Sequence, residues 1–266
     1  MRLVFYLSTA IVLAWPATPI TAQGGDSNTE ACLQKSGAEA IAGCTAAIQS
    51  GKLSTANLAI MFYDRGLEYA LRNDNDHAIA DINEAIRLNP RHSQAFFNRG
   101  VIYDRQKDDS RAIADYSEAI RLNPQYANPF YNRGVVYNRQ ENYVSAIADF
   151  SEAIRLNPKF AEAFVNRGIA YANQQDYARA IDDFSQVIHL DPQSAMAFSN
   201  RGNIYRVQQS YTHAIADFND AIRLDPKYVQ ALYGRGLVKA KLGQSAQGKA
   251  DVARALAIDP SVAKQF

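Results

Sequence analysis

The sequence predicts an all-helical chain of stacked antiparallel helix pairs, on three observations. A pattern of 34 residues returns with little change, and one of its clearest copies covers residues 127–160. Apolar residues within each copy recur at spacings of three and four, which places them on one face of a helix. Only residues 140–142 separate the two apolar halves of this copy, so its two helices must run antiparallel. A fixed period of this length indicates stacked units instead of one globular core.

Six copies follow one another, and each ends two residues after a proline. They cover 59–92, 93–126, 127–160, 161–194, 195–228 and 229–262, and residues 263–266 form a C-terminal tail. Asn157 and Pro158 end the second helix of the third copy, because the residue before proline disfavours the α region and proline cannot donate to a continuing helix. We therefore expect the chain to reverse at each of these prolines.

Each half of a copy predicts one amphipathic helix. The first half has a large apolar residue at position four, glycine at position eight and, in five copies, tyrosine at position eleven. The second half has an aromatic residue at position twenty-four in most copies, four residues after an alanine such as Ala146. Gly134 and Ala146 are small enough to let Phe130, Tyr137 and Phe150 interlock around them.

These residues resemble the tetratricopeptide repeat, whose pattern is a bulky residue, then Leu-Gly, Tyr, Ala-x3-Phe and Pro at fixed offsets. The resemblance covers residue 59 to about residue 261. It implies a right-handed superhelical solenoid in which the first helices line a concave surface, with positions two, five, six, nine, twelve and thirteen pointing into it. One departure is systematic, because position seven is usually leucine in the family and is arginine in all six copies here.

The arginine at position seven recurs together with an aspartate at position twenty-three. We expect structural ion pairs within each copy, because pairing with the preceding copy would give Arg65 only Gly43 as a partner. A row of cations for an anionic ligand is the alternative interpretation. The six expected pairs are Arg65 with Asp81, Arg99 with Asp115, Arg133 with Asp149, Arg167 with Asp183, Arg201 with Asp217, and Arg235 with Asp251.

Asparagine recurs at position six, and aromatic residues recur at position five. An asparagine side chain offers both a donor and an acceptor to an extended backbone, and the pattern resembles family members that hold peptides on an asparagine ladder. The alternative is that these asparagines only solvate a surface or cap local backbone. The family's clamp for chaperone tails needs lysine at five and asparagine at nine, which no copy has. The candidate peptide-binding residues are Asn98, Asn132, Asn166, Asn200, Tyr63, Phe97, Tyr131 and Tyr233.

Residues 1–22 predict a signal peptide. Arg2 precedes an apolar run over residues 3–15, and Ile20-x-Ala22 matches a cleavage site. The alternative, an uncleaved membrane anchor, is disfavoured because the run is short for spanning a bilayer. Cleavage would leave residues 23–28 as a flexible terminus and a chain without membrane insertion. We therefore expect an exported protein, either periplasmic or secreted.

Residues 29–58 resemble a worn copy that contains both cysteines, Cys32 and Cys44. Two short helices joined at Ser36-Gly37 would face each other, and an oxidising compartment would favour a disulfide over two buried thiols. Such a bond would add about 3 kcal/mol to the stability of this degenerate unit. A redox role is disfavoured because the spacing is not C-x-x-C. Ser54 is the expected N-cap of a helix over residues 55–71.

Charge and the missing motifs restrict the function. The chain has 28 basic and 27 acidic residues, and removing the leader with its one arginine leaves 27 of each, which argues against nucleic acid as a partner. The sequence contains no H-E-x-x-H, no Cys/His cluster, no phosphate loop and no G-x-S-x-G. We expect no metal, no cofactor and no enzymatic activity.

The expected function is a protein-protein interaction scaffold that binds an extended protein segment in its groove. The alternative is a self-assembling structural component of a cell-envelope complex. Because no further helix follows the last copy, it could form a homo-oligomer through that C-terminal repeat.

Overall fold

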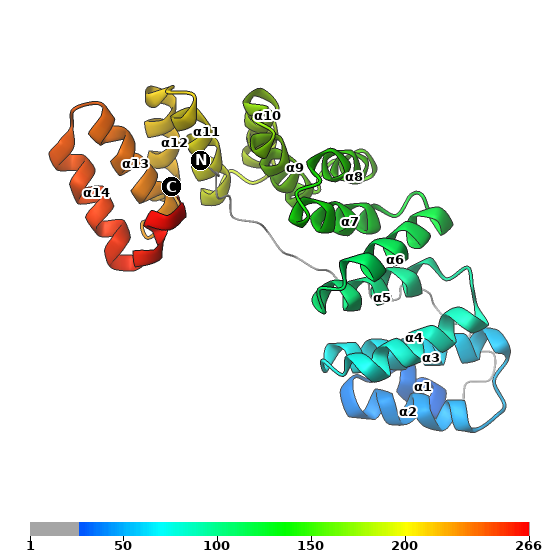
Figure 1. Cartoon of the computed structure of the whole chain (residues 1–266). Coiled ribbons are helices and arrows are strands. Elements are labelled where there is room, and N and C mark those ends of the chain that lie inside the picture. Colours follow the sequence, from blue (N-terminus) through cyan, green and yellow to red (C-terminus); the bar gives the residue numbers. More distant parts are fainter. Residues whose placement is uncertain (1–26, 266) are drawn as a thin grey trace. The chain divides into compact units, whose positions relative to one another are not determined.

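The computed structural model describes residues 27–265, which form fourteen α-helices and one 3₁₀-helix and contain no strand (Figure 1). The predicted all-helical class is therefore confirmed. The chain divides between Val136 and Tyr137 into two units, which we call the N-terminal unit (described over 27–136) and the C-terminal unit (described over 137–265). The predicted signal peptide, residues 1–22, lies outside the described residues, as do residues 23–26 of the predicted flexible terminus.

The N-terminal unit is built of antiparallel helix pairs. α1 packs on α2, α3 on α4 and α5 on α6, and α2 and α4 also contact the first helix of the following pair. α7 begins in this unit and crosses the division. The helices are α1 (Ser27–Gln34), α2 (Gly37–Gln49), α3 (Thr55–Leu71), α4 (Asn75–Leu88), α5 (Ser93–Arg105), α6 (Asp109–Leu122) and α7 (Ala127–Arg139).

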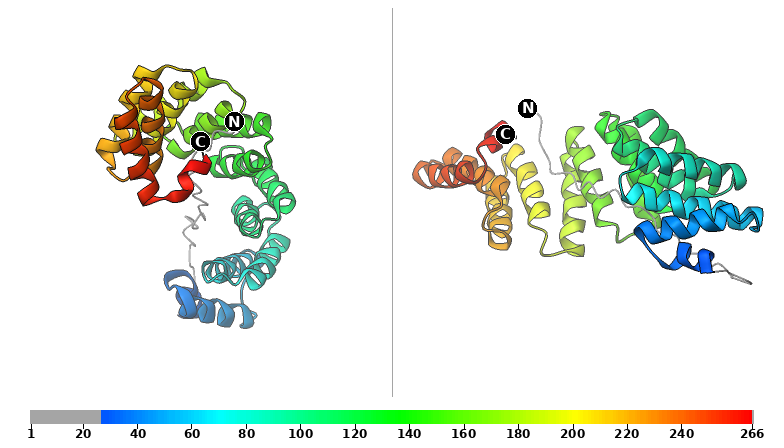
Figure 2. Two further views of the ribbon diagram at one scale, coloured as in Figure 1. Left: turned by 60° about the vertical axis from the view of Figure 1, so that its left-hand side comes forward. Right: turned by 90° about the horizontal axis from the view of Figure 1, so that it is seen from below.

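The C-terminal unit repeats this arrangement. α9 packs on α10, α11 on α12 and α13 on α14, while α8 contacts α9. Figure 2 shows α13 and α14, coloured orange to red, as one such pair. The helices are α8 (Tyr143–Leu156), α9 (Ala161–Asn173), α10 (Tyr177–Leu190), α11 (Ala195–Val207), α12 (Tyr211–Leu224), α13 (Val229–Lys241) and α14 (Ser245–Ile258), followed by the 3₁₀-helix η1 (Pro260–Gln265).

The turn inside each pair uses one left-handed residue followed, in most copies, by a side-chain cap. In the second copy Lys107 has φ +62°, and the Asp108 carboxylate then accepts a 3.0 Å hydrogen bond from the Arg111 backbone N–H at the start of α6. The sixth copy places Gly243 at the left-handed position, which is the residue that this conformation favours. The connection is therefore defined by local chemistry in each copy.

The end of each second helix is also defined by residues that are close together in the chain. In the third copy α8 ends at Leu156, one residue before Asn157, as the Asn-Pro pair predicts. The Asn157 side chain accepts a 3.2 Å hydrogen bond from the Lys159 backbone N–H. The equivalent asparagine or aspartate makes the same bond two residues on in the other five copies. This Asx turn reverses the chain toward the next first helix.

The two ends of the described chain depart from the regular pattern. α1 begins at Ser27, two residues before the predicted start. At the other end, residues 263–265 of the predicted tail belong to η1, which packs against α13 and α14. Val262 in η1 is fully buried beside Leu232 and Ala255. η1 therefore covers part of the last pair, and stacking of this end on another copy stays a prediction.

Candidate functional site

Five of the six predicted Arg–Asp pairs lie within one unit, and the structure brings each of them together. Nε and Nη2 of the arginine donate to the two carboxylate oxygens of the aspartate over 2.7–2.9 Å. The sixth pair, Arg133 with Asp149, spans the division between the units and stays a prediction. The five pairs, which we call rungs, are Arg65–Asp81, Arg99–Asp115, Arg167–Asp183, Arg201–Asp217 and Arg235–Asp251.

Each arginine at position seven also donates to the preceding copy. Its Nη1 reaches a side-chain oxygen at position twenty-five of that copy over 2.5–3.0 Å, for example Ser151 from Arg167. The guanidinium of Arg167 further lies over the Phe164 ring, 5.5 Å from its centroid. This tie between copies is not among the sequence-based predictions, although a serine, threonine or asparagine recurs at position twenty-five. The acceptors are Thr45, Asn83, Ser117, Ser151, Ser185 and Asn219.

These contacts favour the structural interpretation of the arginines. The arginine side chains of the rungs are only 15–20% exposed, and all three guanidinium nitrogens are engaged. The bidentate contact raises the pKa of Arg65, Arg99 and Arg201 above its usual value. An anionic ligand would therefore have to displace a buried carboxylate from each guanidinium.

The asparagine row at position six is buried, although the sequence predicts that it lines an open surface. The exposed fraction of the residue is 0% for Asn98 and Asn166, 3% for Asn132 and 4% for Asn200. Adjacent first helices approach each other, as α3 does α5 and α11 does α13. A side chain at position six consequently lies between first helices, where an unmet hydrogen bond costs free energy.

One asparagine of the row has a partner on the preceding first helix. Asn98 Nδ2 donates to the Tyr63 hydroxyl over 2.7 Å. Tyr63 is 1% exposed, and burial raises the pKa of its hydroxyl. Its ring also contacts His92, with centroids 4.6 Å apart. Tyr63 is therefore a core residue, and its predicted exposure to a partner is wrong.

Two other asparagines of the row keep an unused donor. Asn132 Nδ2 and Asn200 Nδ2 are buried and have no hydrogen-bond partner. The residue that occupies Tyr63's place one copy earlier is Phe97 for Asn132 and Val165 for Asn200, and neither side chain has an oxygen. The presence or absence of this oxygen can be read from the sequence 35 residues before each asparagine.

The remaining aromatic residues at position five differ in their surroundings. Phe97 is fully buried and contacts the rings of Tyr116 and Tyr126, with centroids 5.9 and 5.1 Å away. Tyr131 is 2% exposed. Tyr233 is half-buried and packs beside Leu232. Phe97 and Tyr131 are therefore not accessible to a partner, because their side chains are buried in the repeat core.

Asp64 occupies position six of the first copy and carries a perturbed carboxyl group. Burial raises its pKa to about 7, and the nearby Glu68 carboxylate adds to the shift. Asp64 Oδ1 is buried without a hydrogen-bond partner. Glu68 instead accepts a 2.7 Å hydrogen bond from the Gly37 backbone N–H at the start of α2. With its pKa at about 7, the Asp64 carboxyl group of the folded protein is mostly neutral in mildly acidic solution.

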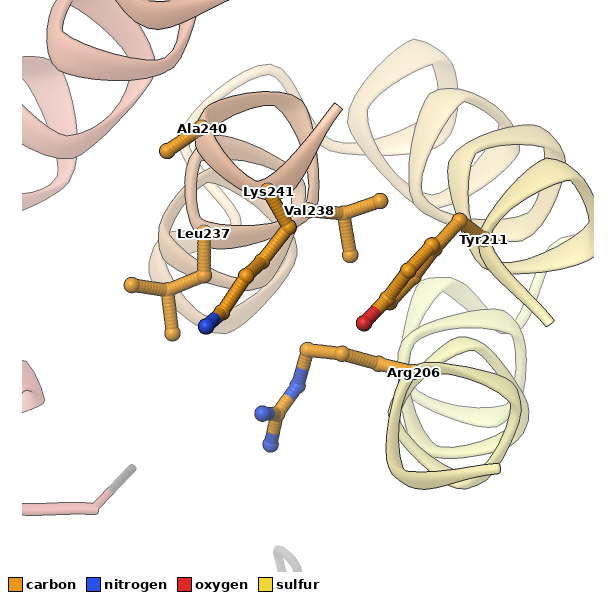
Figure 3. A pocket seen from close by; sticks show the side chains of 6 residues that line it. All are labelled: Arg206, Tyr211, Leu237, Val238, Ala240 and Lys241. Carbon is orange, nitrogen blue, oxygen red and sulfur yellow. The ribbon is translucent and has the colours of Figure 1, made fainter. Parts of the chain in front are cut away.

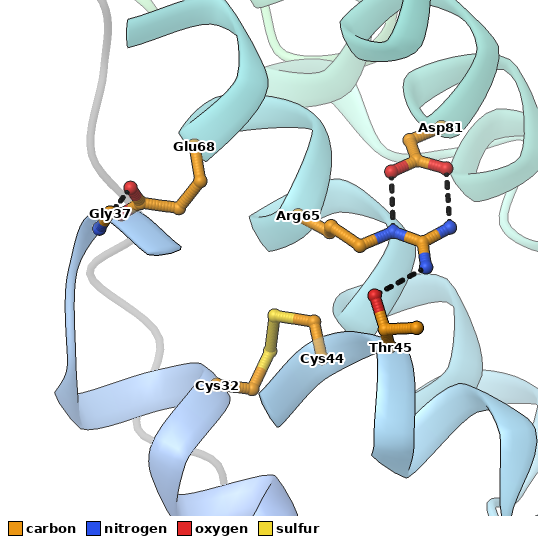
Figure 4. The surroundings of a disulfide bond; sticks show 7 residues. All are labelled: Cys32, Gly37, Cys44, Thr45, Arg65, Glu68 and Asp81. Atoms are coloured by element: carbon orange, nitrogen blue, oxygen red, sulfur yellow. Dashed lines mark hydrogen bonds and ion pairs between the residues drawn. A yellow bond between two sulfur atoms is a disulfide. The ribbon is translucent and has the colours of Figure 1, made fainter. Parts of the chain in front are cut away.

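The structure places Cys32 on α1 and Cys44 on α2 at the distance of the predicted disulfide (Figure 4). Their Cα atoms are 4.5 Å apart. A Cβ added to Gly43 would lie 2.7 Å from the Cys32 backbone nitrogen, so the aspartate of a rung cannot occupy this position. Arg65 reaches the unit through Thr45 instead, over 3.0 Å. The predicted disulfide would lie in the unit that has no rung of its own.

The described residues also bear on two other kinds of site. No group of three or more His, Cys, Asp and Glu side chains within 27–265 is placed to hold a metal ion. Within the same range, no helix has both the length and the apolar character that crossing a membrane requires.

Comparison with known proteins identifies the repeats. A family model described as tetratricopeptide repeat matches residues 63–127 and 131–195, and one described as TPR repeat matches residues 202–243. None of the curated proteins matches this chain.

Solved structures show the same fold. The TPR protein YrrB, described as having an unusual peptide-binding site, is 25% identical, with 72% of this chain and 97% of that chain covered and a TM-score of 0.64. Pseudomonas aeruginosa pilF is 16% identical over 80% of this chain and 97% of that chain, with a TM-score of 0.66. A repeat protein from Parabacteroides merdae is 18% identical over 85% and 90%, with a TM-score of 0.60. With its repeats matched over more than half of its length, the chain belongs to the tetratricopeptide repeat family.

Proposed function

We propose that this protein is an exported, non-enzymatic scaffold that holds an extended segment of a partner protein against its first helices. The repeat fold supports protein-protein interaction as the general function. YrrB, the relative at 25% identity, is described as having a peptide-binding site, which supports the finer proposal of a peptide-like ligand. The segment would lie along the first helices of each unit.

The observation that carries the proposal is the pair of unused amide donors, Asn132 Nδ2 in the N-terminal unit and Asn200 Nδ2 in the C-terminal unit. A buried donor without an acceptor costs about 1–3 kcal/mol. A backbone carbonyl of a bound segment would remove this cost without reading the segment's side chains. Since both residues are 3–4% exposed, the segment must move the neighbouring side chains aside to reach them.

Photo-crosslinking at matched positions tests this proposal. Val135 lies on α7 one turn from Asn132 and is half-buried, whereas Val144 on α8 is 72% exposed. A benzophenone amino acid at residue 135 should crosslink a defined partner peptide in native envelope extract, and the same group at residue 144 should not. Equal crosslinking from both positions would remove the first-helix face from the mechanism.

A second arm tests the role of the donors. The double variant Asn132→Ala/Asn200→Ala should reduce crosslinking at residue 135 while leaving the thermal unfolding midpoint nearly unchanged. The variant Asn98→Ala is the control for fold damage, because its amide already bonds to Tyr63. Unchanged crosslinking in the double variant would exclude the asparagine row as the binding element.

Export is proposed from the leader sequence and is supported by the Cys32–Cys44 disulfide. Disulfides of this kind persist in oxidising compartments and are rare in the cytosol. The mature protein should start at Gln23 in N-terminal sequencing of the periplasmic or secreted fraction. Thiol labelling under denaturing, non-reducing conditions should leave both cysteines unlabelled, and stoichiometric labelling of both would overturn the proposal.

Self-assembly through the C-terminal repeat is a second candidate. Leu242, which directly follows α13, and Ile258, which ends α14, are 47% and 44% exposed, and each places a large apolar side chain at the surface of the last helix pair. η1 covers part of this pair, which favours the scaffold over the polymer. Sedimentation velocity at increasing protein concentration should give a single monomeric species, and a concentration-dependent rise in mass that Leu242→Lys abolishes would favour self-assembly.

A further inference from the structure

A cavity in the C-terminal unit combines an apolar wall with two cations. Its volume is about 430 Å³, within the roughly 300–1,000 Å³ range of ligand pockets. Figure 3 shows Arg206, Tyr211 and Lys241 pointing toward the same space, with Leu237 beside it. The cavity is lined by Arg206 on α11, Tyr211 at the start of α12, and Leu237, Val238, Ala240 and Lys241 on α13.

The cavity lies on the side of the repeats where a bound segment is proposed. Arg206 occupies position twelve of the fifth copy, and Leu237 and Lys241 occupy positions nine and thirteen of the sixth. These are positions that line the first-helix face in the family resemblance. All six lining residues belong to the C-terminal unit, so the cavity is complete within it.

The charges at the cavity are of one sign. No acidic side chain lines it, and Lys241 makes no ion pair with any described residue. Burial lowers the pKa of Arg206, yet a guanidinium stays protonated in proteins. Its Nε donates to Asn203 Oδ1 over a long 3.4 Å.

We propose that this cavity binds an acidic side chain, Asp or Glu, that stands next to an aliphatic or aromatic residue in the partner segment. The Arg206 fork and the Lys241 ammonium would hold the carboxylate, and the Tyr211 hydroxyl would donate to it. Leu237 and Val238 would take the apolar neighbour. This inference rests on the proposed function and adds the chemical class of the segment.

The proposed ligand is an internal acidic residue and not a chain end. The family's clamp for terminal carboxylates needs a lysine at position five and an asparagine at position nine, and no copy has them. The near balance of 28 basic and 27 acidic residues also gives no broad positive surface for a polyanion. Two cations beside an apolar wall fit one carboxylate and one apolar side chain.

Peptide selection on the folded mature protein tests the proposal. A random peptide library is displayed so that each peptide is internal to a carrier protein and has no free carboxyl terminus. The immobilised baits are the wild type, Arg206→Gln/Lys241→Gln, Arg206→Glu/Lys241→Glu, and the control Lys227→Gln/Lys249→Gln. The control removes the same two charges from exposed positions of the same unit. Circular dichroism melting checks that each bait folds.

The proposal expects Asp or Glu beside an apolar residue among peptides selected by the wild type and by the control. The Gln variant should lose the acidic preference, and the Glu variant should select Lys or Arg in its place. In solution, changing Glu to Gln in a selected peptide should weaken binding to the wild type about 10- to 100-fold and leave binding to the Gln variant unchanged.

The outcomes separate the two proposals. If the wild type enriches no peptide, the proposed segment-binding function fails and this inference fails with it. If the wild type and the Gln variant enrich the same peptides without an acidic preference, only the inference is overturned. It is likewise overturned if acidic selectivity appears solely in a second library that displays free carboxyl termini.

Discussion

The asparagine at position six and the arginine at position seven are neighbours in sequence in four copies, yet their surroundings differ in kind. The arginines repeat the same contacts, since every described rung is bidentate and every arginine also reaches position twenty-five of the preceding copy. The asparagines do not, because Asn98 bonds to Tyr63 while Asn132 and Asn200 have unused donors. A repeated residue therefore has a repeated role only where its partners also repeat.

The difference indicates that the arginine row is structural and that the contacts of the asparagine row change from copy to copy. The arginine row has its partners inside the chain at each described rung, so its contribution should be to stability and register. The asparagine row has partners that vary with the residue one copy earlier. The four predictions below test this contrast, beginning with the row whose loss should cost the most.

Removing an arginine of a rung should give the largest loss of stability. Arg167→Ala leaves the Asp183 carboxylate, 3% exposed, without its partner, and breaking such a pair costs about 3–5 kcal/mol. Urea unfolding followed by circular dichroism measures the change. The control is Arg155→Ala, whose partner Glu152 lies on the surface and whose loss should leave the midpoint unchanged. Equal midpoints for the two variants would contradict the structural role of the rungs.

Asp64, which replaces asparagine at one end of the row, should make stability depend on pH. Its pKa is raised to about 7 by burial, above the unfolded value of about 3.9. The folded state thus holds the proton more tightly, and this stabilisation is complete below pH 4 and is lost as the pH rises through 7. Asp64→Asn resembles the neutral form of the side chain at every pH. The free energy of unfolding of this variant, measured relative to the wild type, should therefore rise by about 2 kcal/mol between pH 5 and pH 8.

Urea unfolding of both proteins across this pH range measures the effect. Taking the difference between the two proteins cancels the contributions of other titrating groups. A difference that stays constant from pH 5 to pH 8, or that shrinks with rising pH, would contradict the raised pKa of Asp64.

The sequence predicted those parts of the fold that depend on residues close together in the chain. The helix over 55–71, with Ser54 as its cap, is found with the predicted bounds, because capping involves residues within one turn. The rungs could be placed because arginine and aspartate recur sixteen residues apart in every copy. Only pairing within a copy gives every arginine an aspartate partner. Local patterns that repeat six times leave few alternatives.

The burial of the asparagine row could not be read from the same pattern. Whether position six is open depends on how closely successive first helices pack, and that spacing is set by many side chains together. The cavity could not be predicted for a related reason, because Arg206 and Lys241 are 35 residues apart and only the fifth copy has a basic residue at position twelve. A search for repeats is insensitive to residues that occur once.

The first test of the asparagine row itself compares Asn98 with Asn200. Asn98→Ala leaves the Tyr63 hydroxyl buried without its donor, which should cost about 1–2 kcal/mol. Asn200→Ala removes an amide whose Nδ2 has no partner, so the midpoint should move less than in Asn98→Ala. Both changes sit at the same repeat position and delete the same atoms. Equal losses in urea unfolding would show that the two asparagines have the same role after all.

The smallest expected effect is a gain, and it tests why Asn132 differs from Asn98. Phe97 stands one copy before Asn132, where Tyr63 stands before Asn98. Phe97→Tyr should bring a hydroxyl to the unused Asn132 Nδ2 and stabilise the N-terminal unit by about 0.5–1 kcal/mol. The increase in urea midpoint should vanish in the double variant Phe97→Tyr/Asn132→Ala. If Phe97→Tyr destabilises the protein, the hydroxyl does not fit, and the unused donor then has a cause other than the missing oxygen. If the gain is observed, the same variant should also weaken partner crosslinking at residue 135, because the added hydroxyl competes with the partner's carbonyl for one N–H.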